Sequence, residues 1–231
     1  MKRIALMLLA VAALLLPGIV AAPAASATGV ISNGLAITTH QFPTINPFDT
    51  EFCTLGAVGT DSSGNKIGIT AAHCAEGPYA AVDGAPFYRM APGGPREHIG
   101  TIAYRSPGGT YGEDWLVIKL NSDAVLTSNG PGARIDGIGA ANPTGIHCKD
   151  GAGTGVRCGT ITTSTATRFY STALIGGGDS GGPAFQDNTK IVGLNRGTGD
   201  GGFEFIKFST VLAGIAAQSN PVGQGFVITN N

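Results

Sequence analysis

Short apolar segments of strand length, separated by turn-forming residues, are the feature that most constrains the fold of this chain. Such segments recur at a spacing of about 8 to 12 residues, which is typical of β-sandwiches and β-barrels. They lie at 54–60, 66–71, 98–105, 114–120, 156–164, 182–186, 190–195 and 203–208. One stretch, 209–218, has an amphipathic helical pattern, with Ser209 or Thr210 as the expected N-cap. The pattern predicts an all-β protein with one helix late in the sequence.

Turn formers dominate the region around 126–145, which includes the sequence SNGPGARIDG. We predict a linker there. It would divide the rest of the domain into two parts of similar size, about 28–125 and about 146–231. The composition agrees with a turn-rich globular β protein, since the chain contains 37 glycines and only 13% charged residues.

The first 27 residues have the three parts of a secretory signal peptide. Lys2 and Arg3 precede the apolar run IALMLLAVAALLL, and ASA at 25–27 forms an A-x-A cleavage site. An uncleaved membrane anchor is the alternative, but the Pro-Gly pair at 17–18 interrupts the run before the ~20 residues that span a bilayer. We therefore expect export from the cell, with 1–27 removed and 28–231 as the mature domain.

The charge balance gives no electrostatic reason to expect a nucleic-acid partner. The 14 basic and 15 acidic residues give a net charge of −1, which becomes −3 when Lys2 and Arg3 leave with the signal peptide. No later stretch is apolar enough to span a membrane. We expect a monomer that binds neither nucleic acid nor, after signal cleavage, a membrane.

Four cysteines are present, Cys53, Cys74, Cys148 and Cys158, and none belongs to a C-x-x-C pair. An even count in an exported protein favours two disulfides over free thiols or a zinc site. Three pairings are possible. The sequential one, Cys53–Cys74 with Cys148–Cys158, closes two local loops.

The sequence IGGGDSGGPAF at 175–185 places one serine, Ser180, among five glycines. Glycine admits backbone conformations and close approaches that a Cβ would block. A tight turn here would let the N–H groups of Gly178 and Ser180 converge on one point beside an exposed hydroxyl, as an oxyanion hole requires. A plain surface turn is the alternative for this motif taken alone.

Two further segments carry side chains that would complete a nucleophilic site. His73, in ITAAHCAEG, ends an apolar strand and precedes a cysteine, while Asp114 opens the apolar segment DWLVIKL. A buried carboxylate needs a partner, and a histidine N–H would serve while holding the ring in the tautomer that accepts a proton from Ser180. Taken singly, a surface histidine and a turn aspartate are the alternatives.

The three motifs together, TAAHC, DWLVIKL and GDSGGP in this order, resemble the chymotrypsin-like serine proteases. The resemblance implies two six-stranded antiparallel β-barrels, with the C-terminal helix appended and the site between the barrels. It implies His73 as general base, Asp114 as its orienting group and Ser180 as nucleophile. Gly178 and Ser180 would form the oxyanion hole.

Finer features resemble the bacterial streptogrisin and α-lytic protease branch. ISNGLAITT followed by CTLGAVGT is similar to that branch's mature start, and CKDGAGTGVRCGTI is similar to its second disulfide hairpin. In that branch a basic residue after the first cysteine of the hairpin pairs with the aspartate before the nucleophile. The resemblance therefore implies an ion pair between Lys149 and Asp179, with lysine in place of the usual arginine; a solvated hairpin lysine is the alternative.

This chain departs from that pattern at three places. A long pro-region has no room between the cleavage site and the domain, and no disulfide lies beside the nucleophile loop. Arg196 stands where a serine beside the catalytic aspartate is usual, so a cation would either disturb the site or point into solvent. We assign Leu174, Arg196 and Thr198 to the specificity pocket. Apolar Leu174 predicts small or medium apolar P1 residues, although acidic Asp200 and Glu204 lie close by in sequence.

The sequence therefore predicts a secreted serine endopeptidase that acts on polypeptides and needs no cofactor or metal. The alternatives are an inactive binding module on the same fold and an esterase-like serine hydrolase. We expect His40, His98 and His147 to be structural or surface residues rather than metal ligands.

Overall fold

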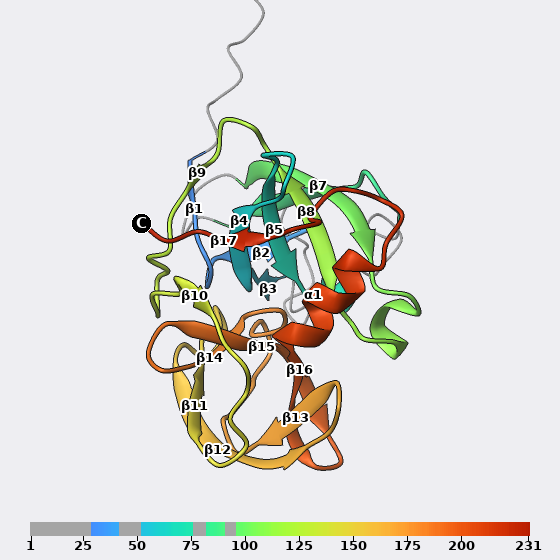
Figure 1. Ribbon diagram of the computed structural model, residues 1–231. Coiled ribbons are helices and arrows are strands. Elements are labelled where there is room, and N and C mark those ends of the chain that lie inside the picture. Colours follow the sequence, from blue (N-terminus) through green and yellow to red (C-terminus); the bar gives the residue numbers. More distant parts are fainter. Residues whose placement is uncertain (1–28, 42–51, 76–81, 91–95) are drawn as a thin grey trace, which may run out of the picture.

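The computed structural model describes residues 29–41, 52–75, 82–90 and 96–231. Two β units lie one above the other, and a helix runs along one side of both (Figure 1). The predicted signal peptide lies outside the described residues. Among those described, no helix is long and apolar enough to cross a bilayer.

The first unit is an eight-stranded, antiparallel sheet that curls on itself. β3 and β4 are two parts of one bent segment, because only Leu55 and Gly56 separate them, and β2 and β5 pair with its successive parts. The predicted six-stranded barrel is thus a curled sheet rather than a barrel closed by a continuous ladder. Its order is β17 (Val227–Ile228), β4 (Ala57–Thr60), β5 (Lys66–Thr70), β8 (Leu116–Leu120), β7 (Glu97–Arg105), β6 (Pro86–Arg89), β2 (Ala36–Thr38) and β3 (Cys53–Thr54).

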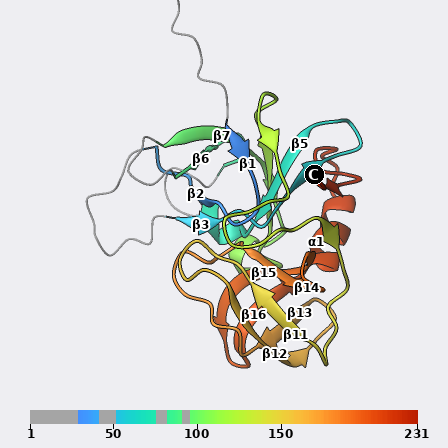
Figure 2. The same cartoon turned by 90° about the vertical axis from the view of Figure 1, so that its left-hand side faces the viewer.

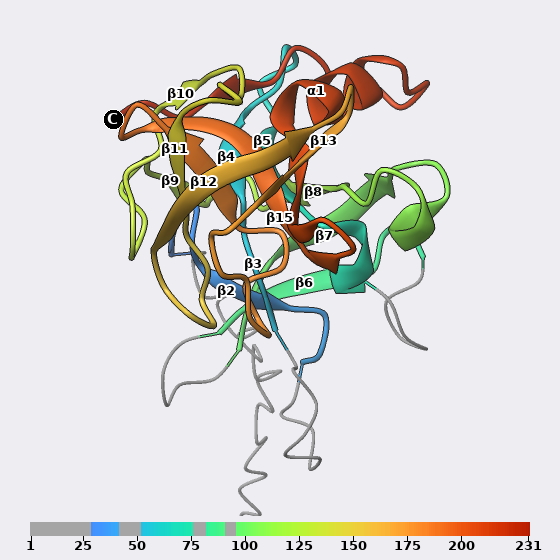
Figure 3. The ribbon, with the colours of Figure 1, turned by 90° about the horizontal axis from the view of Figure 1, so that it is seen from below.

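The second unit is the closed six-stranded antiparallel barrel that was predicted, because β15 pairs with both β14 and β16. Its strands wrap around one another when the molecule is seen from below (Figure 3). The order is β15 (Lys190–Gly199), β14 (Pro183–Gln186), β11 (Ile146–Lys149), β12 (Arg157–Ser164), β13 (Arg168–Ser171) and β16 (Gly202–Lys207), with β10 (Gly137–Ile138) added parallel to β15.

Apolar side chains fill each unit and also join the two. A buried cluster combines residues of the first sheet with residues of the second unit and the helix, including Trp115, Leu194 and Phe208. Helix α1 (Phe208–Ala216) buries Val211 and Ile215 in this cluster. The helix begins at Phe208, with Lys207 as N-cap and no side-chain cap bond, so the predicted cap at Ser209 or Thr210 is wrong.

The connection between the two units is tied to both of them. β9 (Val125–Leu126) pairs in parallel with β1 (Val30–Ile31) on the first unit, whereas β10 pairs with β15 on the second. Seen from the side, this connection runs along the surface from one unit to the other (Figure 2). Residues from distant parts of the chain are therefore held in fixed relation where the units meet.

Candidate active site

His73 lies directly after β5, in the short 3-10 helix η1 (Ala72–Ala75). Its neighbour Cys74 is bonded to Cys53, and the second disulfide joins Cys148 to Cys158, so the structure has the sequential pairing. The first disulfide ties η1 to β3, and a quarter of the His73 side chain stays exposed. Although Cys53, His73 and Cys74 cluster together, both sulfurs are in the disulfide and are not thiolate ligands.

Asp114 is buried beside His73, in the loop between the 3-10 helix η2 (Gly109–Tyr111) and β8. Its Oδ1 accepts the His73 backbone N–H at 2.9 Å, and its Oδ2 lies 2.8 Å from His73 Nδ1. A carboxylate can only accept, so Nδ1 carries a proton, and in the neutral ring Nε2 then keeps a free lone pair. This is the tautomer that a general base needs.

Ser180 and His73 line one cavity of about 340 Å³ between the two units. The segment that carries Ser180 is held against β3 by Thr54, a buried residue that no sequence motif indicated. The Thr54 N–H donates to Ser180 O at 2.8 Å, and Thr54 Oγ1 donates to Gly178 O at 2.7 Å. The residues that line the cavity together with His73 and Ser180 are Ile37, Thr38, Thr39, His40, Phe52, Cys53, Cys74, Gly177 and Gly178.

The turn before Ser180 has the backbone form that its glycines permit. Gly178 has φ +87°, and a Cβ there would meet the ring of Phe52, so only glycine fits. Within the described part of the chain, the N–H groups of Gly178 and Ser180 donate to no protein acceptor. Both donors are therefore available to an oxygen atom placed in the cavity.

Lys149 and Asp179 form a buried ion pair behind this turn. Lys149 Nζ donates to Asp179 Oδ2 at 2.5 Å, and both side chains are fully buried. Oδ2 also accepts from Gly176 N and Thr154 Oγ1, and Oδ1 from Gly153 N and Thr154 N. Burial alone would raise the pKa of Asp179, but these donors outweigh it and hold the pKa below its ordinary value. The carboxylate thus stays charged and fixes the turn.

Arg196 contacts Asp114 rather than pointing into solvent. Its Nε lies 3.3 Å from Asp114 Oδ2, although the Nε–H is not aimed at this oxygen and has no acceptor among the described residues. Its Nη2 donates to Thr110 O, and its Nη1 donates to Glu204. The guanidinium is therefore engaged with the Asp114 loop.

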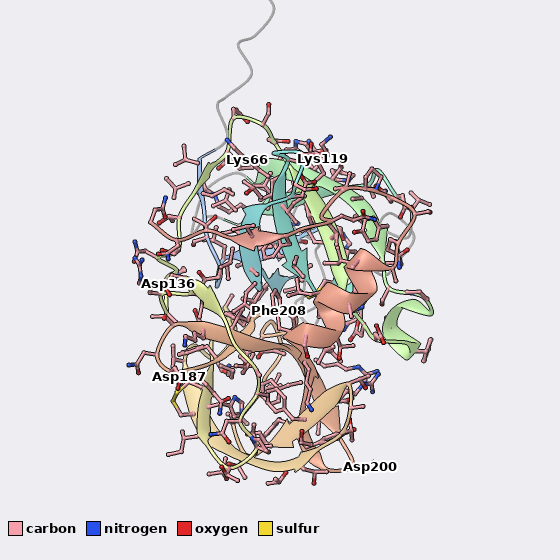
Figure 4. All side chains as sticks on the ribbon, in the orientation of Figure 1. Lys66, Lys119, Asp136, Asp187, Asp200 and Phe208 are labelled. Carbon is pink, nitrogen blue, oxygen red and sulfur yellow. A yellow bond between two sulfur atoms is a disulfide. The ribbon has the colours of Figure 1, made fainter. Side chains whose placement is uncertain are left out.

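The other residues assigned to the specificity pocket are more open. Leu174 is 46% exposed and Thr198 is exposed. Glu204 is buried and paired with Arg196 and Arg168, so its charge is balanced. Asp200 lies at the end of the second barrel that points away from the first unit (Figure 4).

The three remaining histidines differ in setting. His40 lines the cavity that contains His73, a placement that the sequence did not predict. His98 is exposed, whereas His147 is buried between Phe169 and Phe205 and bonds to Ser171. Burial lowers the pKa of His147 to about 4.

No protein-family model and no curated protein matches the sequence. Solved structures match the fold over most of the chain. Thermobifida fusca protease A shows a TM-score of 0.61 at 22% identity, over 87% of this chain and 100% of that one. Nocardiopsis protease gives 0.59 at 21%, over 80% and 95%. The chymotrypsin of Cellulomonas bogoriensis gives 0.58 at 21%, over 87% and 100%. The chain therefore has the fold of the bacterial chymotrypsin-like serine proteases.

Proposed function

We propose that this chain is a secreted serine endopeptidase, with residues 28–231 as its peptidase domain. The observation that carries the proposal is the arrangement around Asp114, whose two oxygens both bind His73 while His73 shares a cavity with Ser180. The fold shared with bacterial proteases supports the same reaction class. The predicted signal peptide and the two disulfides support secretion.

The proposed reaction proceeds through an acyl-enzyme. His73 Nε2 takes the proton of Ser180 Oγ as this oxygen attacks the peptide carbonyl, and the new oxyanion accepts from the N–H groups of Gly178 and Ser180. The imidazolium then gives its proton to the leaving amine. Asp114 holds the ring and stabilises its positive charge. Water, activated by His73, releases the acyl group and restores Ser180.

The buried pair between Lys149 and Asp179 has a structural part in this proposal. Asp179 adjoins Ser180, and its bond from Gly176 N closes the turn that presents the two N–H donors. The pair would order this turn without a cleavage of the chain that frees a new N-terminus. We assign Lys149 and Asp179 to positioning, and the chemical steps to His73 and Ser180.

We assign P1 specificity to Leu174 and Thr198 and expect small or medium apolar P1 side chains. Leu174 is apolar and open, and the charge of the buried Glu204 is balanced by Arg168 and Arg196, so this carboxylate is not free to attract arginine or lysine. Arg196 donates hydrogen bonds to Glu204 and Thr110 and contacts Asp114, and we assign its role to the Asp114 loop instead.

An inactive binding module on the same fold is the second candidate. The observation that favours it is the cation of Arg196 beside Asp114, because this charge opposes the imidazolium that the reaction forms. The hydrogen bonds between His73 and Asp114 are nevertheless intact, which favours the enzyme.

Cleavage of a peptide library by the mature domain, analysed by mass spectrometry, tests the function and the P1 assignment together. We expect cuts after small or medium apolar residues, lost in Ser180→Ala and kept in the matched control Ser164→Ala, which changes an exposed serine on β12. Cuts mainly after Arg or Lys contradict the P1 assignment. Hydrolysis of small esters without any peptide cleavage indicates an esterase, and no turnover of either substrate favours the binding module.

A further inference from the structure

The loop that carries Asp114 has an unfavourable backbone and needs support. Asp114 has φ +56°, a left-handed conformation that is uncommon outside glycine, and Gly108 and Gly109 in the same loop also have positive φ. A residue in such a conformation persists only where its surroundings hold it there. The two hydrogen bonds to His73 depend on this loop geometry.

The support comes from three charged residues of the second barrel, Arg196, Glu204 and Arg168, which we call the arginine clamp. Arg196 Nη2 donates to Thr110 O at 2.9 Å, and Arg168 Nη2 donates to Gly112 O at 2.5 Å. The two arginines, from β15 and β13, therefore donate hydrogen bonds to two backbone carbonyls of the Asp114 loop.

Glu204 fixes both arginines at once. Its Oε1 accepts from Arg168 Nη1 at 2.6 Å, and its Oε2 accepts from Arg196 Nη1 at 2.5 Å. The Glu204 side chain is only 4% exposed, and each arginine side chain is 24% exposed. Water screens charges poorly in such a setting, so the clamp acts on Asp114 through charge as well as through hydrogen bonds.

The charge of Arg196 opposes protonation of His73. Its guanidinium lies beside the carboxylate oxygen that binds His73 Nδ1, but its Nε–H is not directed at that oxygen. It therefore weakens the field that favours imidazolium without taking the hydrogen bond. Glu204 offsets part of this effect because its carboxylate contacts the same guanidinium.

Other charged or titratable groups near the Asp114 loop are the same in every variant compared or can be controlled. Glu113 accepts from Trp115 Nε1 and is present in all the variants, and the Lys149–Asp179 pair is internally neutral. His40 lines the same cavity as His73, and a histidine changes charge between about pH 5 and 8. A His40→Gln background removes this second titration.

We propose that the arginine clamp positions Asp114 against His73 and couples the protonation of His73 to the charges of Arg196 and Glu204. Arg196 and Glu204 are positioning residues in this proposal. The proposal rests on the proposed function only for its consequence in catalysis, since the protonation of His73 can be measured without turnover.

The test follows the imidazole signal of His73 by NMR across pH in the mature domain, in the His40→Gln background, together with the rate of fluorophosphonate labelling. Arg196→Gln removes the opposing cation, and we expect the pH of half-protonation of His73 to rise by about one unit. Glu204→Gln leaves the cation uncompensated, and we expect this pH to fall. Lys190→Gln, an exposed change on the same strand as Arg196, should leave it in place.

Opposite shifts in the two variants support the clamp, and the acidic limb of the labelling rate should move with them. Equal or same-direction shifts overturn it, as does a wild-type midpoint in Arg196→Gln. Arg196→Lys keeps the positive charge but loses the forked guanidinium, so the pH of half-protonation of His73 should stay near that of the wild type while labelling slows. If Arg196→Gln does not fold, Arg196→Lys and Glu204→Gln provide the test. Shifts as expected in a protein that never labels would retain the clamp and refute the peptidase.

Discussion

Replacement of Lys149 by methionine tests the ordering of the oxyanion turn most sharply. Methionine is similar in length to lysine and fits a buried site, but it leaves the charge of Asp179 without its counter-ion. Breaking a buried ion pair from one side costs about 3 to 5 kcal/mol. Asp179 keeps four donors, from Gly153, Thr154 and Gly176, so we expect a cost near the lower end, about 3 kcal/mol.

This cost should destabilise mainly the turn that the ion pair fixes, residues 176–180. If the competent turn comes to lie about 3 kcal/mol above the other conformations of this segment, its population falls to about one in a hundred. The second-order rate constant of fluorophosphonate labelling should fall by the same factor. Urea denaturation should show a loss of stability of no more than about 3 kcal/mol, since the rest of the core is untouched.

Two further variants separate the ion pair from general damage. Lys119→Met removes an exposed lysine on β8, in the first unit (Figure 4), and should change neither quantity. The double variant Lys149→Met with Asp179→Asn leaves no unpaired buried charge and should be more stable than the single variant. Labelling of Lys149→Met within threefold of wild type would refute the role that we give to the pair.

Three other predictions concern groups outside the reaction itself. The pKa of His147 is about 6.5 in the unfolded chain and about 4 in the folded one, so the free energy of unfolding should fall by about 2 kcal/mol between pH 7 and 4.5. In urea denaturation, His147→Gln should abolish this part of the loss, and an unchanged pH dependence in this variant would contradict the prediction. Thr54→Val leaves Gly178 O without its donor, so labelling should slow by about tenfold, whereas Thr60→Val at an exposed position should not. Replacing Cys53 and Cys74 together by alanine should lower the free energy of unfolding by about 3 kcal/mol, and a loss below about 1 kcal/mol in urea denaturation would count against this reasoning.

The longer strands could be predicted from sequence because each has enough residues to show a pattern. The apolar segment at 66–71 corresponds to β5 and that at 98–105 to β7. Strands of two residues, such as β1 and β17, show no periodicity and form only because a partner strand lies beside them. The start of α1 was predicted wrongly because the helix follows directly after β16 and has no capping side chain to mark its first residue.

Some residues of the candidate site could also be predicted from sequence, whereas others could not. His73, Asp114 and Ser180 could be proposed because each stands in a distinctive local motif. Thr54 could not, because its bond to Gly178 joins residues 124 positions apart and a buried threonine in a strand is unremarkable in sequence. The position of Arg196 drew attention, but the contact of its side chain with Asp114 depends on Glu204, which faces it from the neighbouring strand.

The proposed reaction requires Ser180 to be a nucleophile activated by His73, and covalent labelling measures this reactivity. The mature protein is treated with a fluorophosphonate and the modified peptide is identified by mass spectrometry. We expect one adduct, on Ser180, that is absent in Ser180→Ala and strongly reduced in His73→Ala. A folded wild-type protein that forms no adduct, or an adduct on another residue that persists in Ser180→Ala, would contradict it.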